Sequence, residues 1–167
     1  IAAAFLLGSL LVHELAHAIV ARRHGLRVEG VTFWLFGGLA KLGGDAPTPR
    51  AEWRIAAVGP ATNLVLGAAA FGAAQVLAAF SAPQVAVAVA GYVVWVNAML
   101  GVFNLLPAAP LDGGRILRAV LWRRHGDRER ATVTAAKAGQ LMGGALMGLG
   151  AMQFLLVSAV GGVWTAL

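Results

Sequence analysis

Two histidines and a glutamate lie close together near the start of the chain, in the stretch from Val12 to Ala18. If this stretch is helical, His13 and His17 are four residues apart and share one face, so both imidazoles can reach the same metal ion. Glu14 lies beside that face, where it can take a proton from a water on the metal. Zinc suits this chemistry because it lowers the pKa of bound water to about 7 and polarises a carbonyl group. The residue types and their spacing therefore predict half of a zinc peptidase site.

The element that must hold this trio is an almost wholly apolar helix. From Ile1 to Ala21, the only other strongly polar residue is Ser9. Ionisable side chains at membrane depth are costly, so they usually face a protein interior and serve a function. The alternative is a helix with two buried, hydrogen-bonded histidines and a partner carboxylate. It is disfavoured because Glu14 would then be charged and desolvated with nothing to offset the cost.

The composition indicates a membrane protein. Of the 167 residues, 59% are hydrophobic and only 12% are charged, whereas an ordinary soluble domain is about one quarter charged. We expect an all-α polytopic membrane protein, a bundle of about four to six transmembrane helices. Residues 1–167 are predicted to form a single membrane-embedded domain, a fragment of a longer protein that lacks flanking helices. With no cysteines in the chain, a zinc site must use nitrogen and oxygen ligands.

The net charge of +6 is distributed as expected for a membrane protein rather than a nucleic-acid-binding protein. All thirteen Lys and Arg residues fall between residues 22 and 54 or between residues 115 and 137, at the ends of apolar spans. By the positive-inside rule, we expect both basic segments on the cytoplasmic side of the cell membrane.

The expected helices alternate with short connections. They cover residues 2–24, 50–80 and 84–106, then a short amphipathic helix up to residue 124, and a last span near residues 132–157. The prolines at 47 and 49 are taken to exclude a helix before residue 50. Residues 161–167 are interpreted as a turn or the stump of a further helix.

Residues 27–43 form a short membrane-associated β or re-entrant segment in this interpretation. Its first half alternates and is rich in β-branched and aromatic residues, which is typical of strands. A strand edge at Phe36, Gly37, Gly38 and Leu39 could pair with an unwound substrate through its main chain. A plain amphipathic loop at the membrane interface remains an equal alternative.

A catalytic zinc site needs a third protein ligand, and Asp112 is the best candidate. It follows a proline-broken helix end on the same side as the histidines, and Gly113-Gly114 lets the backbone bend it inward. The alternative role for Asp112 is an ordinary helix N-cap. The other acidic and histidine candidates are expected in the surface loop or at the membrane interface: Glu29, Glu52, His24 and His125.

Three motifs together resemble the site-2 protease family of intramembrane zinc metalloproteases. They are His13-Glu14-Leu15-Ala16-His17, then Gly59-Pro60-Ala61-Thr62-Asn63, then Asn104-Leu105-Leu106-Pro107 with Leu111-Asp112-Gly113. The resemblance is closest to the bacterial and archaeal branch that includes sporulation-factor proteases and members with CBS domains. Neither a PDZ insertion nor a CBS domain is present in this sequence.

The resemblance implies one Zn²⁺ per chain, bound by His13, His17 and Asp112, with Glu14 as general acid and base. It also suggests that Asn63 and Asn104 lie near the site and hold the substrate backbone or polarise the scissile carbonyl. Asparagines that only join helices are the alternative.

We therefore predict an intramembrane zinc metalloendopeptidase that acts in regulated intramembrane proteolysis. The expected partners are the lipid bilayer and a transmembrane substrate, such as a membrane-bound transcription regulator or an anti-sigma or pro-sigma-type factor. The alternative function is a metal-transporting or metal-sensing membrane protein that uses the same ligands without hydrolysis.

Overall fold

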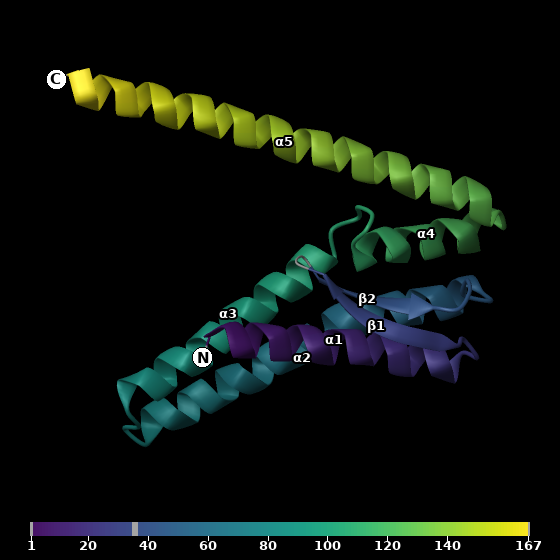
Figure 1. Cartoon of the computed structure of the whole chain (residues 1–167), viewed down its shortest axis with the longest axis horizontal. Helices are drawn as coiled ribbons and strands as arrows, with labels where there is room; N and C mark the ends of the chain where they lie inside the picture. Colours follow the sequence, from purple (N-terminus) through teal and green to yellow (C-terminus); the bar gives the residue numbers. More distant parts are fainter. Residues whose placement is uncertain (1, 35–36, 167) are drawn as a thin grey trace.

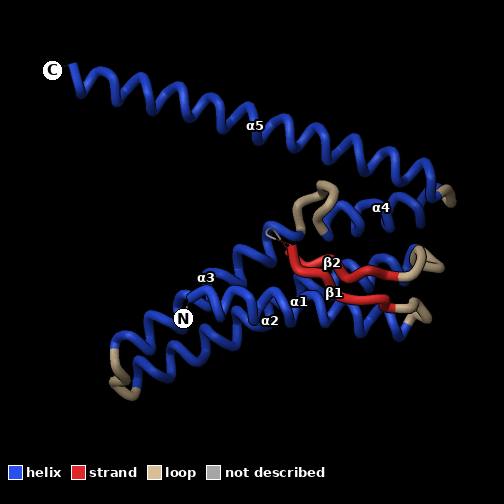
Figure 2. The backbone as a smooth tube through the Cα atoms, viewed as in Figure 1, coloured by secondary structure: helices blue, strands red, loops and turns tan. Residues whose placement is uncertain are grey.

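The computed structural model describes residues 2–34 and 37–166, which form five helices and one pair of strands (Figure 1). In chain order the elements are α1 (Ala2–Arg23), β1 (Val28–Trp34), β2 (Gly37–Leu42), α2 (Pro49–Ala79), α3 (Gln84–Asn104), α4 (Asp112–His125) and α5 (Arg128–Ala166). Helices dominate the fold, as Figure 2 shows. The five helices fall within the predicted range, and most boundaries lie within two residues of those expected from the sequence.

Three of these helices are long and apolar enough to cross a membrane: α1, α2 and α3. The shortest candidate spans have 21 residues, or about 31 Å at 1.5 Å per residue, which matches the hydrocarbon thickness of a bilayer. Helix α2 packs against both α1 and α3. The three helices therefore form the core of the bundle.

The side chains are distributed as in a protein surrounded by lipid. Apart from Ile55, Pro60 and Val96, the buried apolar side chains among the described residues are those of alanines. Large apolar side chains instead point outward, with Leu7 60%, Val65 68% and Phe71 55% exposed. Small residues let membrane helices approach closely, and lipid tails solvate the large ones.

Helix α2 begins one residue earlier than the prolines suggested. Thr48 accepts a hydrogen bond from the backbone N–H of Ala51 at 3.1 Å, and Pro49 occupies the first helical position. Proline is tolerated there because its missing N–H would have no partner inside the helix. The prediction that Pro49 excludes a helix was therefore wrong. The helix also continues through Pro60 without interruption.

Strands β1 and β2 pair antiparallel, with Val31 opposite Ala40 and Trp34 opposite Gly37. The register shifts between Val28 and Gly30. The two strands form a ribbon that packs beside α1 (Figure 1). Residues 35–36, which join the strands, lie outside the described part of the chain.

Helix α5 extends well beyond the predicted span of residues 132–157. It starts at Arg128, packs on α4 through buried Ala131 and Ala135, and then diverges from the other helices (Figure 1). Residues 161–166 continue the same helix, so the predicted turn or separate helix stump there was wrong. Within the described residues, the candidate membrane spans are α1, α2 and α3, and α5 is not one of them.

Candidate metal centre

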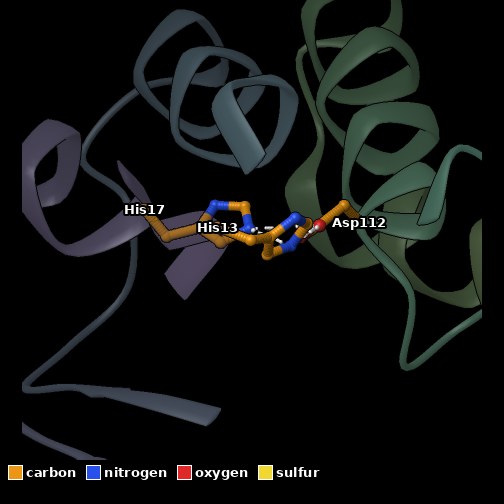
Figure 3. Close-up of side chains that lie close together, drawn as sticks. All are labelled: His13, His17 and Asp112. Atoms are coloured by element: carbon orange, nitrogen blue, oxygen red, sulfur yellow. Dashed lines mark hydrogen bonds and ion pairs between the residues drawn. The ribbon is translucent and has the colours of Figure 1, made fainter. Parts of the chain in front are cut away.

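Three side chains from two distant parts of the chain converge inside the bundle: His13, His17 and Asp112 (Figure 3). The Nε2 atoms of the two histidines are 3.0 Å apart, and each lies 3.1 Å from Asp112 Oδ2. All three residues are buried, with 2%, 4% and 8% of their surfaces exposed. We call these residues the metal cluster. Asp112 lies 99 residues from His13 in the sequence, so tertiary packing brings it there.

The donor set fits a zinc ion. Ligand atoms at zinc bond lengths of 2.0–2.1 Å in a tetrahedron lie about 3.3 Å apart, close to the spacing observed in the metal cluster. The electrostatics also favour a cation. When both histidines are neutral, the unprotonated His17 Nε2 faces Asp112 Oδ2 at 3.1 Å, so two lone pairs oppose each other. A cation between them, or a proton on His17, removes this repulsion.

His17 is held with its Nε2 free for a metal. Its Nδ1–H donates to the backbone carbonyl of Ile55 at 2.6 Å. A carbonyl only accepts hydrogen bonds, so the proton of the neutral ring must be on Nδ1. Metal-binding histidines are commonly oriented by such a bond.

Asp112 is the first residue of α4, and Leu111 occupies the N-cap position without a side-chain capping bond. The Asp112 carboxylate bonds to the histidines, so the alternative role as an N-cap does not apply. Asp112 lies outside the candidate spans. Burial alone would raise its pKa, but the imidazoles of His13 and His17, which contact the carboxylate and attract it when they are protonated, outweigh burial and lower the pKa to about 2. The carboxyl is therefore ionised at neutral pH, as a metal ligand requires.

The glycines after Asp112 are required for close packing rather than for bending. A Cβ on Gly113 would lie 2.3 Å from the carbonyl oxygens of Leu105 and Leu106. The segment after α3 therefore rests directly on the start of α4. This contact fixes the depth at which Asp112 enters the bundle.

Gly59 on α2 leaves room for the two imidazoles. A Cβ at this position would lie 2.2 Å from His17 Nε2 and 2.6 Å from His13 Nε2. Such distances are far inside van der Waals contact, so only glycine fits. In the sequence, Gly59 stood out only as the first residue of the motif Gly59-Pro60-Ala61-Thr62-Asn63, and its role beside the histidines was not predicted. The motif carried no signal that α2 would touch the histidines.

The structure places the two predicted asparagines differently. Asn63 is fully buried, and its Nδ2 lies 3.1 Å from His13 Nδ1. Asn104 is the last residue of α3, and its Nδ2 donates to the Leu100 carbonyl one turn earlier. Asn63 is thus part of the site, whereas the described contacts of Asn104 lie within its own helix.

The other predicted residues lie on α1 and in the ribbon. Glu14 is 6% exposed and follows His13 on the buried side of α1. Gly37, Gly38 and Leu39 belong to β2, where they pair with Trp34, Phe33 and Thr32. Phe36 lies outside the described residues.

Glu52 was expected in a surface loop, and this was wrong. It lies in the first turn of α2, is 0% exposed, and accepts a hydrogen bond from Arg118 Nε on α4 at 2.8 Å. A second Arg118 nitrogen contacts the same oxygen. The ion pair neutralises a carboxylate that α4 covers, and it ties the helix carrying Asp112 to α2. Sequence spacing gave no sign of this pair because its members are 66 residues apart.

A second buried polar contact lies one turn before His13. Asn97 of α3 is 0% exposed and donates to Ser9 Oγ and to the Val93 carbonyl, both at 2.9 Å. We call this contact the Ser9–Asn97 pair. It joins α1 to α3 deeper in the bundle and was not predicted.

Comparisons with known proteins relate the chain to zinc metalloproteases. Peptidase family M50 matches residues 1–85 and 76–147 of the chain. Rip3 of Mycobacterium tuberculosis, which is assigned as a zinc metalloprotease, is 55% identical over 164 residues, covering 98% of this chain and 42% of Rip3. Zinc metalloprotease MJ0392 of Methanocaldococcus jannaschii is 33% identical over 156 residues, covering 89% of this chain and 43% of that protein.

A solved structure is also similar. The site-2 protease from Methanocaldococcus jannaschii superimposes with a TM-score of 0.67 at 31% identity, covering 91% of this chain and 68% of that one. The chain spans less than half the length of the curated relatives that it matches.

Proposed function

Because the chain belongs to peptidase family M50, the site-2 protease family, we propose that it is the core of an intramembrane zinc metalloendopeptidase. The observation that carries this proposal is the metal cluster, whose three ligand atoms lie within 3.0–3.1 Å of one another among candidate membrane helices. In this proposal residues 1–167 act as one membrane-embedded domain.

His13, His17 and Asp112 would hold one zinc ion through Nε2, Nε2 and Oδ2. Two neutral imidazoles and one carboxylate leave a zinc ion with a net positive charge and an open fourth position. When bound there, zinc supplies a water of lowered pKa and polarises the substrate carbonyl. Gly59 keeps the space beside the histidines free of side-chain atoms.

Glu14 would be the general acid and base. It is buried beside the metal cluster without being one of its three members. Its carboxylate would take a proton from the attacking water and then give it to the leaving amine. A buried glutamate suits this exchange because burial makes the protonated form less costly.

The substrate would be a transmembrane or membrane-proximal segment of a regulatory protein, such as a membrane-bound transcription regulator or an anti-sigma or pro-sigma-type factor. A helical substrate hides its carbonyl groups in its own hydrogen bonds, so it must unwind locally. Each strand of a two-stranded ribbon has an edge that its partner does not cover. We propose that the membrane-associated β2 edge at Gly37, Gly38 and Leu39 receives the unwound chain, with Asn104 as a further substrate contact.

The basic segments 22–54 and 115–137 would face the cytoplasm at the cell membrane. The packing supports a common side for them, because Ala21 near the end of α1 packs on Ala51 and Ile55 near the start of α2. Helix α4, which carries four arginines, also packs on α2. Substrate and water would then enter from this basic side.

The test measures zinc content together with cleavage of a membrane-segment substrate, for the wild type and Glu14→Gln in liposomes. We expect one zinc per chain in both proteins and a loss of about 10²–10⁴-fold in cleavage rate for the variant. Zinc in both proteins without cleavage of a panel of membrane segments would favour the metal-transport alternative. A wild-type chain that binds no zinc would refute the proposed function.

A further inference from the structure

The outer nitrogens of the two histidines contact different kinds of partner. His17 Nδ1 faces a carbonyl oxygen, which fixes its proton on Nδ1 and leaves Nε2 for a metal. His13 Nδ1 faces Asn63 Nδ2 at 3.1 Å, and an amide nitrogen only donates. This contact makes His13 Nδ1 an acceptor and places the ring proton on Nε2. In this arrangement His13 presents N–H, not a lone pair, to the metal cluster.

A turn of the Asn63 side-chain amide would move the His13 ring proton from Nε2 to Nδ1. Its side chain is 0% exposed, and its Oδ1 has no hydrogen-bond partner among the described residues. The two ends of a side-chain amide have nearly the same shape, so a half-turn exchanges oxygen and nitrogen without repacking. Oδ1 would then accept a proton from His13 Nδ1. The amide therefore keeps one hydrogen bond to His13 in either orientation, through Nδ2 in one and through Oδ1 in the other.

Asn97 shows what an asparagine that only joins helices looks like here. It is equally buried, and its Oδ1 is also unpartnered in the described part of the chain. Its Nδ2, however, donates both to Ser9 and to the Val93 carbonyl of its own helix. These two bonds hold the amide in one orientation. The Asn63 side chain makes one hydrogen bond within the described residues, and its partner is His13.

We propose that Asn63 is a positioning residue whose amide turns with metal occupancy. Without metal, Nδ2 donates to His13 Nδ1, and the ring proton stays on Nε2. With metal, Oδ1 accepts a proton on Nδ1, and the unprotonated Nε2 becomes a ligand. His13 loses one proton at Nε2 and gains one at Nδ1, so the ring stays neutral. This inference rests on the proposed role of His13 as a zinc ligand, and it assigns Asn63 to His13 rather than to the substrate.

The first test measures zinc affinity of the full chain in detergent micelles by competition with a chelator of known affinity. Asn63→Leu keeps the branched shape but removes the acceptor, so we expect zinc binding about 10–100-fold weaker, as for other residues that orient metal ligands. Asn63→Asp keeps an acceptor, and its affinity should stay within a few-fold of the wild type. Asn97→Leu is the matched control and should bind zinc like the wild type.

Each other outcome has a defined meaning. Wild-type affinity in Asn63→Leu would overturn the proposal. Equal weakening in Asn63→Leu and Asn97→Leu would assign both residues to general packing, and weakening in Asn63→Asp equal to that in Asn63→Leu would exclude the acceptor role. A wild-type chain that binds no zinc would instead refute the proposed function.

A second measurement reads the position of the ring protons directly in the wild type. In ¹⁵N-histidine spectra of the wild type, His13 should carry its proton on Nε2 without zinc and on Nδ1 with zinc, while His17 carries it on Nδ1 in both states. His13→Gln and His17→Gln spectra assign the two signals. A His13 proton that remains on the same nitrogen when zinc is added would overturn the proposal.

Discussion

The metal cluster and the Ser9–Asn97 pair lie one helical turn apart on the same face of α1, and both are buried. The Ser9–Asn97 pair has one side-chain bond between helices, and its asparagine is also anchored to its own backbone. The metal cluster brings three ligand atoms to one point, and the rings are held from behind by Ile55 and Asn63. Burial alone does not distinguish a reaction site from polar contacts that join helices. The reaction site is distinguished by ligand atoms that converge on one point, by contacts that hold the imidazole rings, and by space left free beside them.

Filling the space beside Gly59 should have the largest effect, because it should disrupt the metal cluster and leave the Ser9–Asn97 pair in place. In Gly59→Ala the new Cβ would lie 2.2 Å from His17 Nε2, so an imidazole or a whole helix must move. We expect zinc affinity to fall by at least about 100-fold, with a loss of about 1–3 kcal/mol in the free energy of unfolding. Zinc competition and denaturant titration in micelles measure both effects.

Gly67→Ala is the matched control for this substitution. Its Cβ would lie 3.5 Å from Asn97 Cβ, which is ordinary contact. Alanine is favoured over glycine in a helix by about 0.5–1 kcal/mol, so stability should be unchanged or slightly higher and zinc affinity unchanged. If both variants retained zinc equally, the space at Gly59 would not be what sets the metal cluster apart.

Loss of the ion pair between α2 and α4 should lower zinc affinity less than Gly59→Ala does, although it should lower stability more. Arg118→Met leaves the fully buried Glu52 carboxylate without compensation, and we expect a loss of about 3–5 kcal/mol in the free energy of unfolding. Glu52→Gln should cost less, about 1–2 kcal/mol, because the Arg118 side chain is 25% exposed and can be hydrated. Denaturant titration of the two variants measures the difference.

The Glu52–Arg118 ion pair should affect the metal cluster and not the Ser9–Asn97 pair, because it holds α4, which carries Asp112. Zinc affinity should fall in Arg118→Met, while the hydrogen bond between Ser9 and Asn97 should persist, as judged by protection of the Asn97 side-chain amide from hydrogen exchange. Equal losses of stability in the two variants would contradict the assignment of Glu52 as a buried charge.

An ion pair outside both regions should have the smallest effect. Asp45 lies before α2 and accepts a hydrogen bond at 2.7 Å from Arg128 at the start of α5. The hydrogen bond from Arg128 lowers the pKa of Asp45. Because the Asp45 side chain is 72% exposed, Asp45→Asn should cost less than about 1 kcal/mol at neutral pH.

The pH dependence of this pair has a definite sign. A carboxyl whose pKa is lower in the folded state stabilises the fold above its unfolded-state pKa of about 3.9, and this contribution is lost as pH falls through the folded value. The difference in unfolding free energy between wild type and Asp45→Asn should therefore shrink from pH 7 to pH 3. A difference that grows on acidification would contradict this assignment.

Local features of the sequence determined much of this protein. The four-residue spacing of His13 and His17 places them on one face of any α-helix, whatever surrounds it. The apolar runs predicted α1, α2 and α3 to within two residues, because length and hydropathy are properties of each segment alone. The motifs led to the family, which the comparisons confirmed.

Only the tertiary structure decided which distant residues meet. It brought Asp112 to the histidines across about a hundred residues, buried Glu52 against Arg118 and made Gly59 the residue whose missing side chain leaves room for the site. It also gave two buried asparagines different roles: Asn63 contacts His13, whereas Asn97 joins α3 to α1 through Ser9. The physical reason is that helix periodicity fixes which face a residue lies on, whereas its neighbours depend on how separate helices pack. Small buried residues such as alanine allow the helices to pack closely, but no short stretch of the sequence shows which helices will pack together.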